Sequence, residues 1–169
     1  MVFQEQVIDS VFPETTFNQL VSVCKRQYKR FPFTEEFGRY FINDKEWTAL
    51  QIYTSPLLGL ARKVFGSSTL EHSYSIFAHY EGNLAALPKH KDNNACTYTL
   101  DVCLYQETPW SLWIEGKEYY LEPNQGIAFY GEDQEHWRED FPNPVNNQVG
   151  QLFVHFVEPE HWYFEEQNA

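Results

Sequence analysis

At 169 residues, the chain is long enough for one domain with a single hydrophobic core and too short for two ordinary ones. Acidic residues number 24 against 12 Lys and Arg, so the formal net charge of −12 repels phosphate backbones and argues against nucleic acid as a partner. A polar stretch over residues 1–10, no apolar run near the roughly 20 residues of a membrane span, and three unpatterned cysteines favour a cytoplasmic protein without a signal peptide or membrane segment.

The first 70 residues carry mostly helical patterns. Thr16-Phe-Asn-Gln19 resembles a capping box and predicts the start of a first helix. A second helical stretch is expected after the Asn43-Asp44 cap and runs toward Val64, with Pro56 splitting it in two. Residues 38–42, between the two helical stretches, are expected to form a short strand. We interpret residues 1–70 as a helical prefix that packs on the rest of the domain.

After residue 70 the pattern changes to short β-rich runs separated by turn residues. Glu115-Gly116 predicts a tight hairpin, and Pro123-Asn124 predicts another turn. The expected strands are 73–80, 86–92, 96–105, 111–114, 118–121, 126–130, 136–139 and 149–157. Eight short strands after helices predict a mainly β fold, a double-stranded β-helix (jelly roll) buttressed by α-helices. The expected organisation is one domain over 1–169, with the roll at 71–159 and a tail at 160–169 that carries no assigned role.

His90-Lys91-Asp92 is the most informative triplet in the chain. Residues two apart on a strand point to the same side, so this imidazole and this carboxylate can reach one ion. His136 follows after four intervening predicted strands, and a closed roll returns the chain beside its starting strand. Two imidazoles and a carboxylate leave three coordination positions open, as in non-haem Fe(II) oxygenases that also bind O2. The pattern fits a catalytic Fe(II) site at His90, Asp92 and His136, although the triplet by itself is more typical of a surface His and Asp beside a Pro-Lys turn.

Several stretches around this triplet extend the pattern. They are Tyr80-Glu-Gly-Asn83, His90-Lys-Asp-Asn93, Thr97-Tyr-Thr-Leu100 and Pro123-Asn-Gln-Gly126-Ile-Ala-Phe129. Together they resemble the core of prolyl-4-hydroxylase-like Fe(II)/2-oxoglutarate-dependent oxygenases over roughly residues 74 to 157. The resemblance implies 2-oxoglutarate as a cosubstrate beside Fe(II) and O2. It also implies hydroxylation of a small molecule, an amino acid or a peptide side chain.

The same resemblance implies a basic residue on the last strand that holds the distal carboxylate of 2-oxoglutarate. Residues 149–157 contain no Arg or Lys, so the chain departs from the pattern here. Arg138, two residues after His136, is one candidate replacement, since a guanidinium binds a carboxylate through two parallel hydrogen bonds. His155 is a second candidate. The alternatives are a surface arginine paired with a neighbouring carboxylate and a core histidine bonded to a backbone carbonyl.

Two tyrosines are further candidates for binding the cosubstrate. Tyr80 lies ten residues before His90 and matches a tyrosine that hydrogen-bonds 2-oxoglutarate in the family. Tyr98 is expected to point inward together with the apolar residues that alternate after it on the same strand. Both rings can equally belong to an ordinary core with a polar tip.

Two other functions remain open from the sequence. One is a cupin-like metalloenzyme that needs no 2-oxoglutarate, and the other is a jelly-roll binding module in which His90 and Asp92 are merely exposed. The acidic charge favours a neutral or cationic small molecule or a peptide as substrate. The sequence does not indicate which substrate is used or whether the protein forms oligomers.

Overall fold

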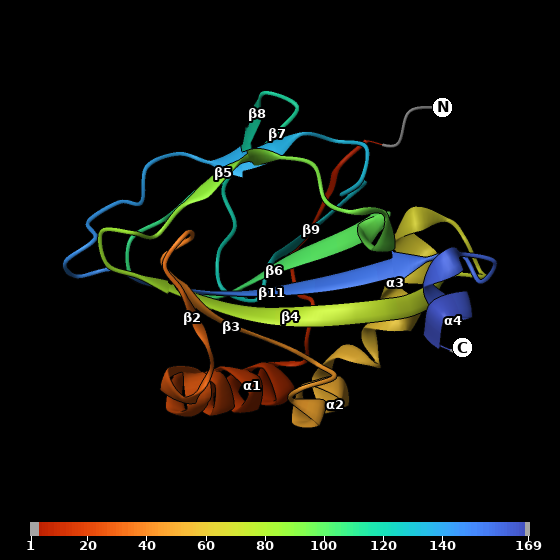
Figure 1. Cartoon of the computed structure of the whole chain (residues 1–169), viewed down its shortest axis with the longest axis horizontal. Coiled ribbons are helices and arrows are strands. Elements are labelled where there is room, and N and C mark those ends of the chain that lie inside the picture. Colours follow the sequence, from red (N-terminus) through yellow and green to blue (C-terminus); the bar gives the residue numbers. More distant parts are fainter. Residues whose placement is uncertain (1–3, 168–169) are drawn as a thin grey trace.

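Two antiparallel sheets lie face to face in the computed structural model, which describes residues 4–167 (Figure 1). The larger sheet has the strand order β1-β9-β6-β11-β4-β3-β2 and the smaller sheet the order β5-β10-β7-β8. The larger sheet consists of β1 (Gln6–Ile8), β9 (Gly126–Phe129), β6 (Tyr98–Gln106), β11 (Gln148–Val157), β4 (Glu71–Glu81), β3 (Arg39–Asn43) and β2 (Phe33–Thr34). The smaller sheet consists of β5 (Leu87–His90), β10 (His136–Arg138), β7 (Leu112–Ile114) and β8 (Lys117–Tyr119).

The eight strands β4 to β11 divide equally between the two sheets and form the double-stranded β-helix. The predicted jelly roll is therefore confirmed, and each of its eight predicted strands is present. The hairpin between β7 and β8 turns at Glu115 and Gly116, whose φ angles of 49° and 79° fit the positive-φ turn that the sequence predicts. Asn124, with φ of 68°, occupies the second predicted turn.

The first 70 residues contribute strands as well as helices, which corrects their description as a helical prefix. β1 pairs with β9 at one edge of the larger sheet, and β3 pairs with β4 toward the other edge, followed by β2. The strand expected at 38–42 is thus part of the main sheet. In its register Arg39 lies opposite Tyr80, so pairing brings a residue of the prefix to the interior strands of the roll.

Helices cover the outer face of the larger sheet, below β4 in the view of Figure 1. They are α1 (Glu14–Gln27), α2 (Gln51–Thr54) and α3 (Leu57–Phe65), with short 3-10 turns η1 (Tyr28–Arg30) and η2 (Thr48–Leu50) beside them; a further 3-10 turn η3 (Asn94–Cys96) and α4 (Trp162–Gln167) follow in the chain. The predicted capping box is wrong, because α1 begins at Glu14 after Pro13, and the Phe17 N–H already bonds the Pro13 carbonyl at 2.9 Å. Pro56 separates α2 from α3 as predicted. Within residues 4–167, no helix is both long and apolar enough to traverse a lipid bilayer.

The larger sheet separates two hydrophobic cores. One lies between this sheet and the helices and contains Leu20, Leu50 and Phe77, while the other fills the space between the sheets and contains Tyr80 and Leu112. Side chains alternate along each strand, so neighbouring residues enter different cores. Polar residues are concentrated on the inner face, at the end of the roll where β5 and β10 meet the ends of β4, β6 and β11.

Candidate metal centre

The ends of two paired strands, β5 and β10, bring together the residues of the predicted metal site. His90 ends β5 and His136 begins β10, and the two residues are direct partners in the antiparallel ladder. Asp92 lies just beyond β5, where its N–H donates to the Gly131 carbonyl at 2.9 Å. One ligand atom each from His90, Asp92 and His136 all lie within 4.8 Å of one another. The return of the chain to its starting strand, inferred from the closed roll, is the pairing of β10 with β5.

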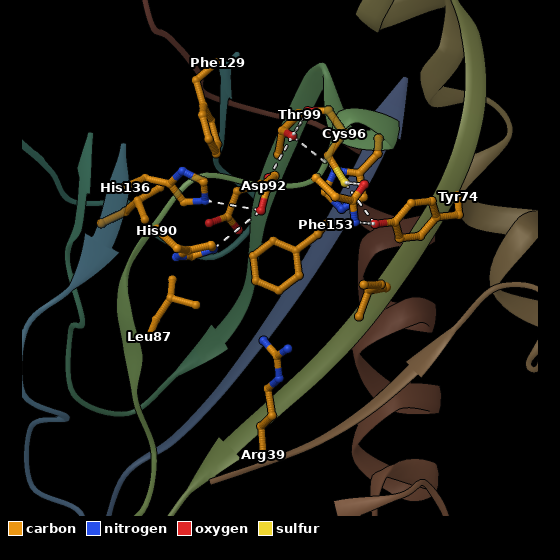
Figure 2. A pocket seen from close by; sticks show the side chains of 15 residues that line it. Arg39, Tyr74, Leu87, His90, Asp92, Cys96, Thr99, Phe129, His136 and Phe153 are labelled. Carbon is orange, nitrogen blue, oxygen red and sulfur yellow. Dashed lines mark hydrogen bonds and ion pairs between the residues drawn. The ribbon is translucent and has the colours of Figure 1, made fainter. Parts of the chain in front are cut away.

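The two imidazoles present the same nitrogen to the carboxylate (Figure 2). The Nε2 atoms of His90 and His136 each lie 3.5 Å from Asp92 Oδ1. The Nδ1 atom of His90 lies 2.7 Å from the Pro88 carbonyl, and that of His136 lies 2.9 Å from the Gln134 carbonyl. A carbonyl only accepts, so both Nδ1 atoms carry the proton and donate it. When either imidazole is neutral, its lone pair is therefore on Nε2 and is directed into the site, as a metal ligand requires.

Two residues hold the Asp92 carboxylate against this pair. Thr99 Oγ1, on β6, lies 3.4 Å from Asp92 Oδ2. Gly131 faces the carboxylate so closely that a Cβ there would overlap Asp92 and Thr99 and would lie 2.7 Å from the Cys96 carbonyl oxygen. Sequence reasoning did not single out Gly131, because only the tertiary approach of its loop makes a side chain impossible there.

Burial and hydrogen bonding shift the pKa values of Asp92 and His90 in opposite directions. Burial alone raises the pKa of Asp92, but hydrogen bonds to His136 and His90 and the nearby His155 outweigh it and hold that pKa far below its usual range. Burial likewise favours a low pKa for His90, but the Asp92 carboxylate and the Pro88 carbonyl outweigh it and raise that pKa above 6.5. The site is thus an ionised carboxylate between two imidazoles, which suits a divalent cation.

A pocket of about 110 Å³ adjoins the triad in the interior of the roll. Leu87, Phe129 and Phe153 form apolar walls (Figure 2). His155 of β11 also lines it and is almost fully buried, with Nδ1 at 3.1 Å from Thr99 Oγ1. Burial lowers the pKa of His155 to about 4, so this imidazole is neutral near pH 7. A neutral imidazole in this position can donate a hydrogen bond to a bound ligand or accept one from it.

Tyr80 and Tyr98, the two predicted tyrosines, lie on opposite sides of the larger sheet. Tyr80 is fully buried between the sheets, where its hydroxyl accepts a hydrogen bond from Arg39 Nη1 at 2.8 Å. Tyr98 faces the helices, packs against Phe65 and donates to Glu158 at 3.2 Å. The expectation that Tyr98 points inward is therefore wrong. The apolar residues at every second position after Tyr98 lie on the same face of β6 and also enter the core under the helices. Thr99 and Asp101, on the opposite face of β6, line the pocket.

Arg138 is buried beside the pocket rather than exposed on the surface. Its Nη2 donates to Asp101 Oδ2 at 2.9 Å, and its Nη1 donates to the Trp110 carbonyl. Its role as the carboxylate anchor stays a prediction, and its guanidinium already has an anionic partner. Arg39 does line the pocket. No local signal in the sequence marked Arg39, because its place depends on the pairing of β3 with β4.

No family model matches the sequence, and no curated protein matches it. By contrast, 278 solved chains match the structure. The non-heme alpha ketoglutarate dependent epimerase SnoN from nogalamycin biosynthesis matches with a TM-score of 0.69 at 12% identity, covering 91% of this chain and 77% of its own. A Pseudomonas putida prolyl-4-hydroxylase matches with 0.68 at 14% identity, covering 91% and 92%. EctD from S. alaskensis with bound Fe matches with 0.69 at 11% identity, covering 91% and 72%.

These likenesses establish the fold. The chain shares the double-stranded β-helix fold of these solved structures, and the fold that the resemblance in the sequence implies is confirmed. The donor set also fits a hard or borderline divalent metal, since two Nε2 atoms and a carboxylate oxygen converge. The other ring nitrogen of each histidine, Nδ1, is bonded to a backbone carbonyl outside the site.

Proposed function

We propose that the chain is an Fe(II)/2-oxoglutarate-dependent oxygenase that hydroxylates a small molecule, an amino acid or a peptide side chain. The observation that carries the proposal is the convergence of His90, Asp92 and His136 within 4.8 Å beside an interior pocket. The fold supports it, because the structures that match include an enzyme described as alpha ketoglutarate dependent and another with bound Fe.

In this function His90 and His136 would bind iron through Nε2, and Asp92 would bind it through a carboxylate oxygen. When bound, the iron with 2-oxoglutarate and O2 supplies the oxidant for a substrate C–H bond. The chain's own residues orient and shield the site. The Pro88 and Gln134 carbonyls fix the two imidazole tautomers through hydrogen bonds of 2.7 and 2.9 Å. Phe129 and other apolar residues of the pocket exclude water from the open side of the triad.

The substrate class follows from charge and from the range of related structures. SnoN has been solved with nogalamycin RO, and a prolyl hydroxylase from Trichoplax adhaerens with a peptide fragment of hypoxia inducible factor. This scaffold therefore accommodates both small molecules and peptides. With a formal net charge of −12, the present chain favours neutral or cationic molecules of either kind over nucleic acid.

An anaerobic titration tests the proposal. Purified protein free of metal is mixed with Fe(II) and then with 2-oxoglutarate, while the weak visible charge-transfer band of the iron chelate is monitored. We expect a band that needs both additions and disappears in His136→Ala. His161→Ala, a histidine outside the pocket, is the matched control and should keep the band. Iron binding without a band would favour the cupin-like enzyme, and no metal binding would favour the non-catalytic module.

A further inference from the structure

The pocket contains a guanidinium as well as the three metal-ligand candidates. Arg39 of β3 lines the same pocket as His90 and Asp92. Figure 2 shows its side chain pointing into the pocket, toward the space between Leu87 and Phe153. Among the described residues that line the pocket, Arg39 is the only arginine or lysine. The pocket thus has a metal-ligand cluster in one region and a single cation in another.

The Arg39 guanidinium lacks an anionic partner within the described chain. Its Nη1 donates to the Tyr80 hydroxyl at 2.8 Å, whereas its Nε is buried without a hydrogen-bond partner. It forms no ion pair with any carboxylate among residues 4–164, whose side chains the structure describes. The rings of Phe37 and Phe41 lie 4.8 and 5.3 Å from its central carbon. Arg39 is partly buried and its charge is unpaired, and this arrangement suits a cation that is completed by a bound anion.

Arg138 provides the contrast. It lies in the same interior, but Asp101 neutralises its charge through a hydrogen bond of 2.9 Å and the Trp110 carbonyl occupies its other amino group. That same ion pair neutralises Asp101, which lines the pocket and would otherwise repel an anion there. Since 149–157 holds no Arg or Lys, the free positive charge of the pocket comes from β3 and not from the last strand.

We propose that Arg39, together with Tyr80, binds the distal carboxylate of 2-oxoglutarate, an assignment that rests on the proposed function. The guanidinium offers donors in a planar fork that matches a carboxylate. The Tyr80 hydroxyl accepts from Arg39, so its own proton is free to donate to the same carboxylate. β3 borders β4 on the side opposite to β11, so the anchor reaches the pocket from the other side of β4.

A pair of ligands isolates the interaction with the distal carboxylate. 2-Oxobutyrate has the same chelating keto-acid end as 2-oxoglutarate but no second carboxylate. Dissociation constants for both are measured anaerobically on the Fe(II)-loaded protein through the charge-transfer band. We expect wild type to bind 2-oxoglutarate more tightly than 2-oxobutyrate. Arg39→Leu should weaken 2-oxoglutarate binding by about tenfold to a hundredfold and leave 2-oxobutyrate binding unchanged.

Further variants keep the test decisive. Arg26→Leu, an exposed arginine on α1, is the matched control and should bind both ligands as wild type does. Tyr80→Phe should weaken 2-oxoglutarate binding alone, by roughly twofold to tenfold. If Arg39→Leu does not fold, Arg39→Gln keeps a hydrogen-bond donor and should still lose the preference for 2-oxoglutarate.

The outcomes separate this inference from the proposed function. A wild-type preference for 2-oxoglutarate that survives in the Arg39 variants would overturn the anchor and leave the oxygenase assignment standing. Loss of that preference in Arg138→Lys instead would move the anchor to Arg138. A wild-type protein that forms no chelate with either keto acid would overturn the proposed function and the anchor together.

Discussion

Gly131 is hydrogen-bonded to Asp92 and packs directly against its carboxylate. The Asp92 N–H donates to the Gly131 carbonyl at 2.9 Å, and the Gly131 Cα faces the Asp92 carboxylate with no room for a side chain. The loop between β9 and β10 therefore determines where the acidic member of the triad lies. The position of Asp92 thus depends on packing as well as on its spacing from His90.

Gly131→Ala should weaken divalent metal binding by at least about tenfold, because the new methyl group displaces the Asp92 carboxylate from the two imidazoles. Metal affinity is measured by titration with Fe(II) or Co(II), and folding is followed by thermal unfolding. Gly59→Ala is the matched control, since Gly59 lies in α3 with nothing within 4 Å of an added Cβ. That variant should keep full metal affinity and gain roughly 0.5–1 kcal/mol of stability. Equal affinities in the two variants would contradict the role of Gly131.

Asp92→Asn should lower metal affinity sharply while the fold is retained. The substitution preserves the shape of the side chain but removes the negative charge that offsets a bound cation, and the remaining ligands are two neutral imidazoles. Asp133→Asn, at an exposed position in the loop between β9 and β10, controls for the loss of one acidic charge. Unchanged metal stoichiometry and affinity in Asp92→Asn would remove Asp92 from the ligand set.

Much of the roll and the triad could be predicted from local patterns. Turn residues such as Glu115-Gly116 separate the strands, and the spacing of His90 and Asp92 places both side chains at one site. In a closed roll, a histidine four strands later returns to the same end. These inferences succeed because strand alternation and turn chemistry are local properties.

Other features of the site depend on which core each face of a strand contacts and on which strands pair. Tyr98 has the right alternation for burial, but β6 separates two cores and alternation alone does not say which one a residue enters. Arg39 lies in a predicted strand, but only the pairing of β3 with β4 brings it to the pocket. Gly131 is constrained by a loop that folds onto Asp92. All three are long-range relationships that no local pattern contains.

Metal affinity should fall as pH decreases. Metal competes with protons for the His90 Nε2, and the pKa of His90 is raised above 6.5, so a proton must be displaced already near neutral pH. Asp92 has a strongly lowered pKa and stays ionised, so it adds no dependence in this range. Below the pKa of His90 we expect a loss of up to about tenfold per pH unit for each displaced proton, and a plateau above it. Titrations with Co(II) across that range check this, and a flat profile would contradict it.

The stability of the metal-free protein should also depend on pH, through a histidine on the other side of the sheet. His79 is fully buried and stacks on Tyr28 with ring centroids 3.6 Å apart. Its Nδ1 lies 2.7 Å from the Tyr105 hydroxyl and its Nε2 lies 3.2 Å from Glu81 Oε2. Burial lowers the pKa of His79 to about 4, whereas the unfolded chain titrates near 6.5. Between these values the unfolded state binds more protons than the folded one, so stability decreases as pH falls.

From pH 7 to pH 5 this single histidine should cost about 2 kcal/mol of unfolding free energy, because each unit of difference in pKa corresponds to about 1.4 kcal/mol. Urea unfolding of the metal-free protein at the two pH values measures the change. His79→Phe keeps an aromatic ring against Tyr28 but cannot bind a proton, so its loss of stability over the same interval should be smaller by about that amount. His155, whose pKa is also lowered to about 4 by burial, contributes in the same direction and remains in the variant. An identical pH dependence in wild type and His79→Phe would show that His79 is not the titrating group.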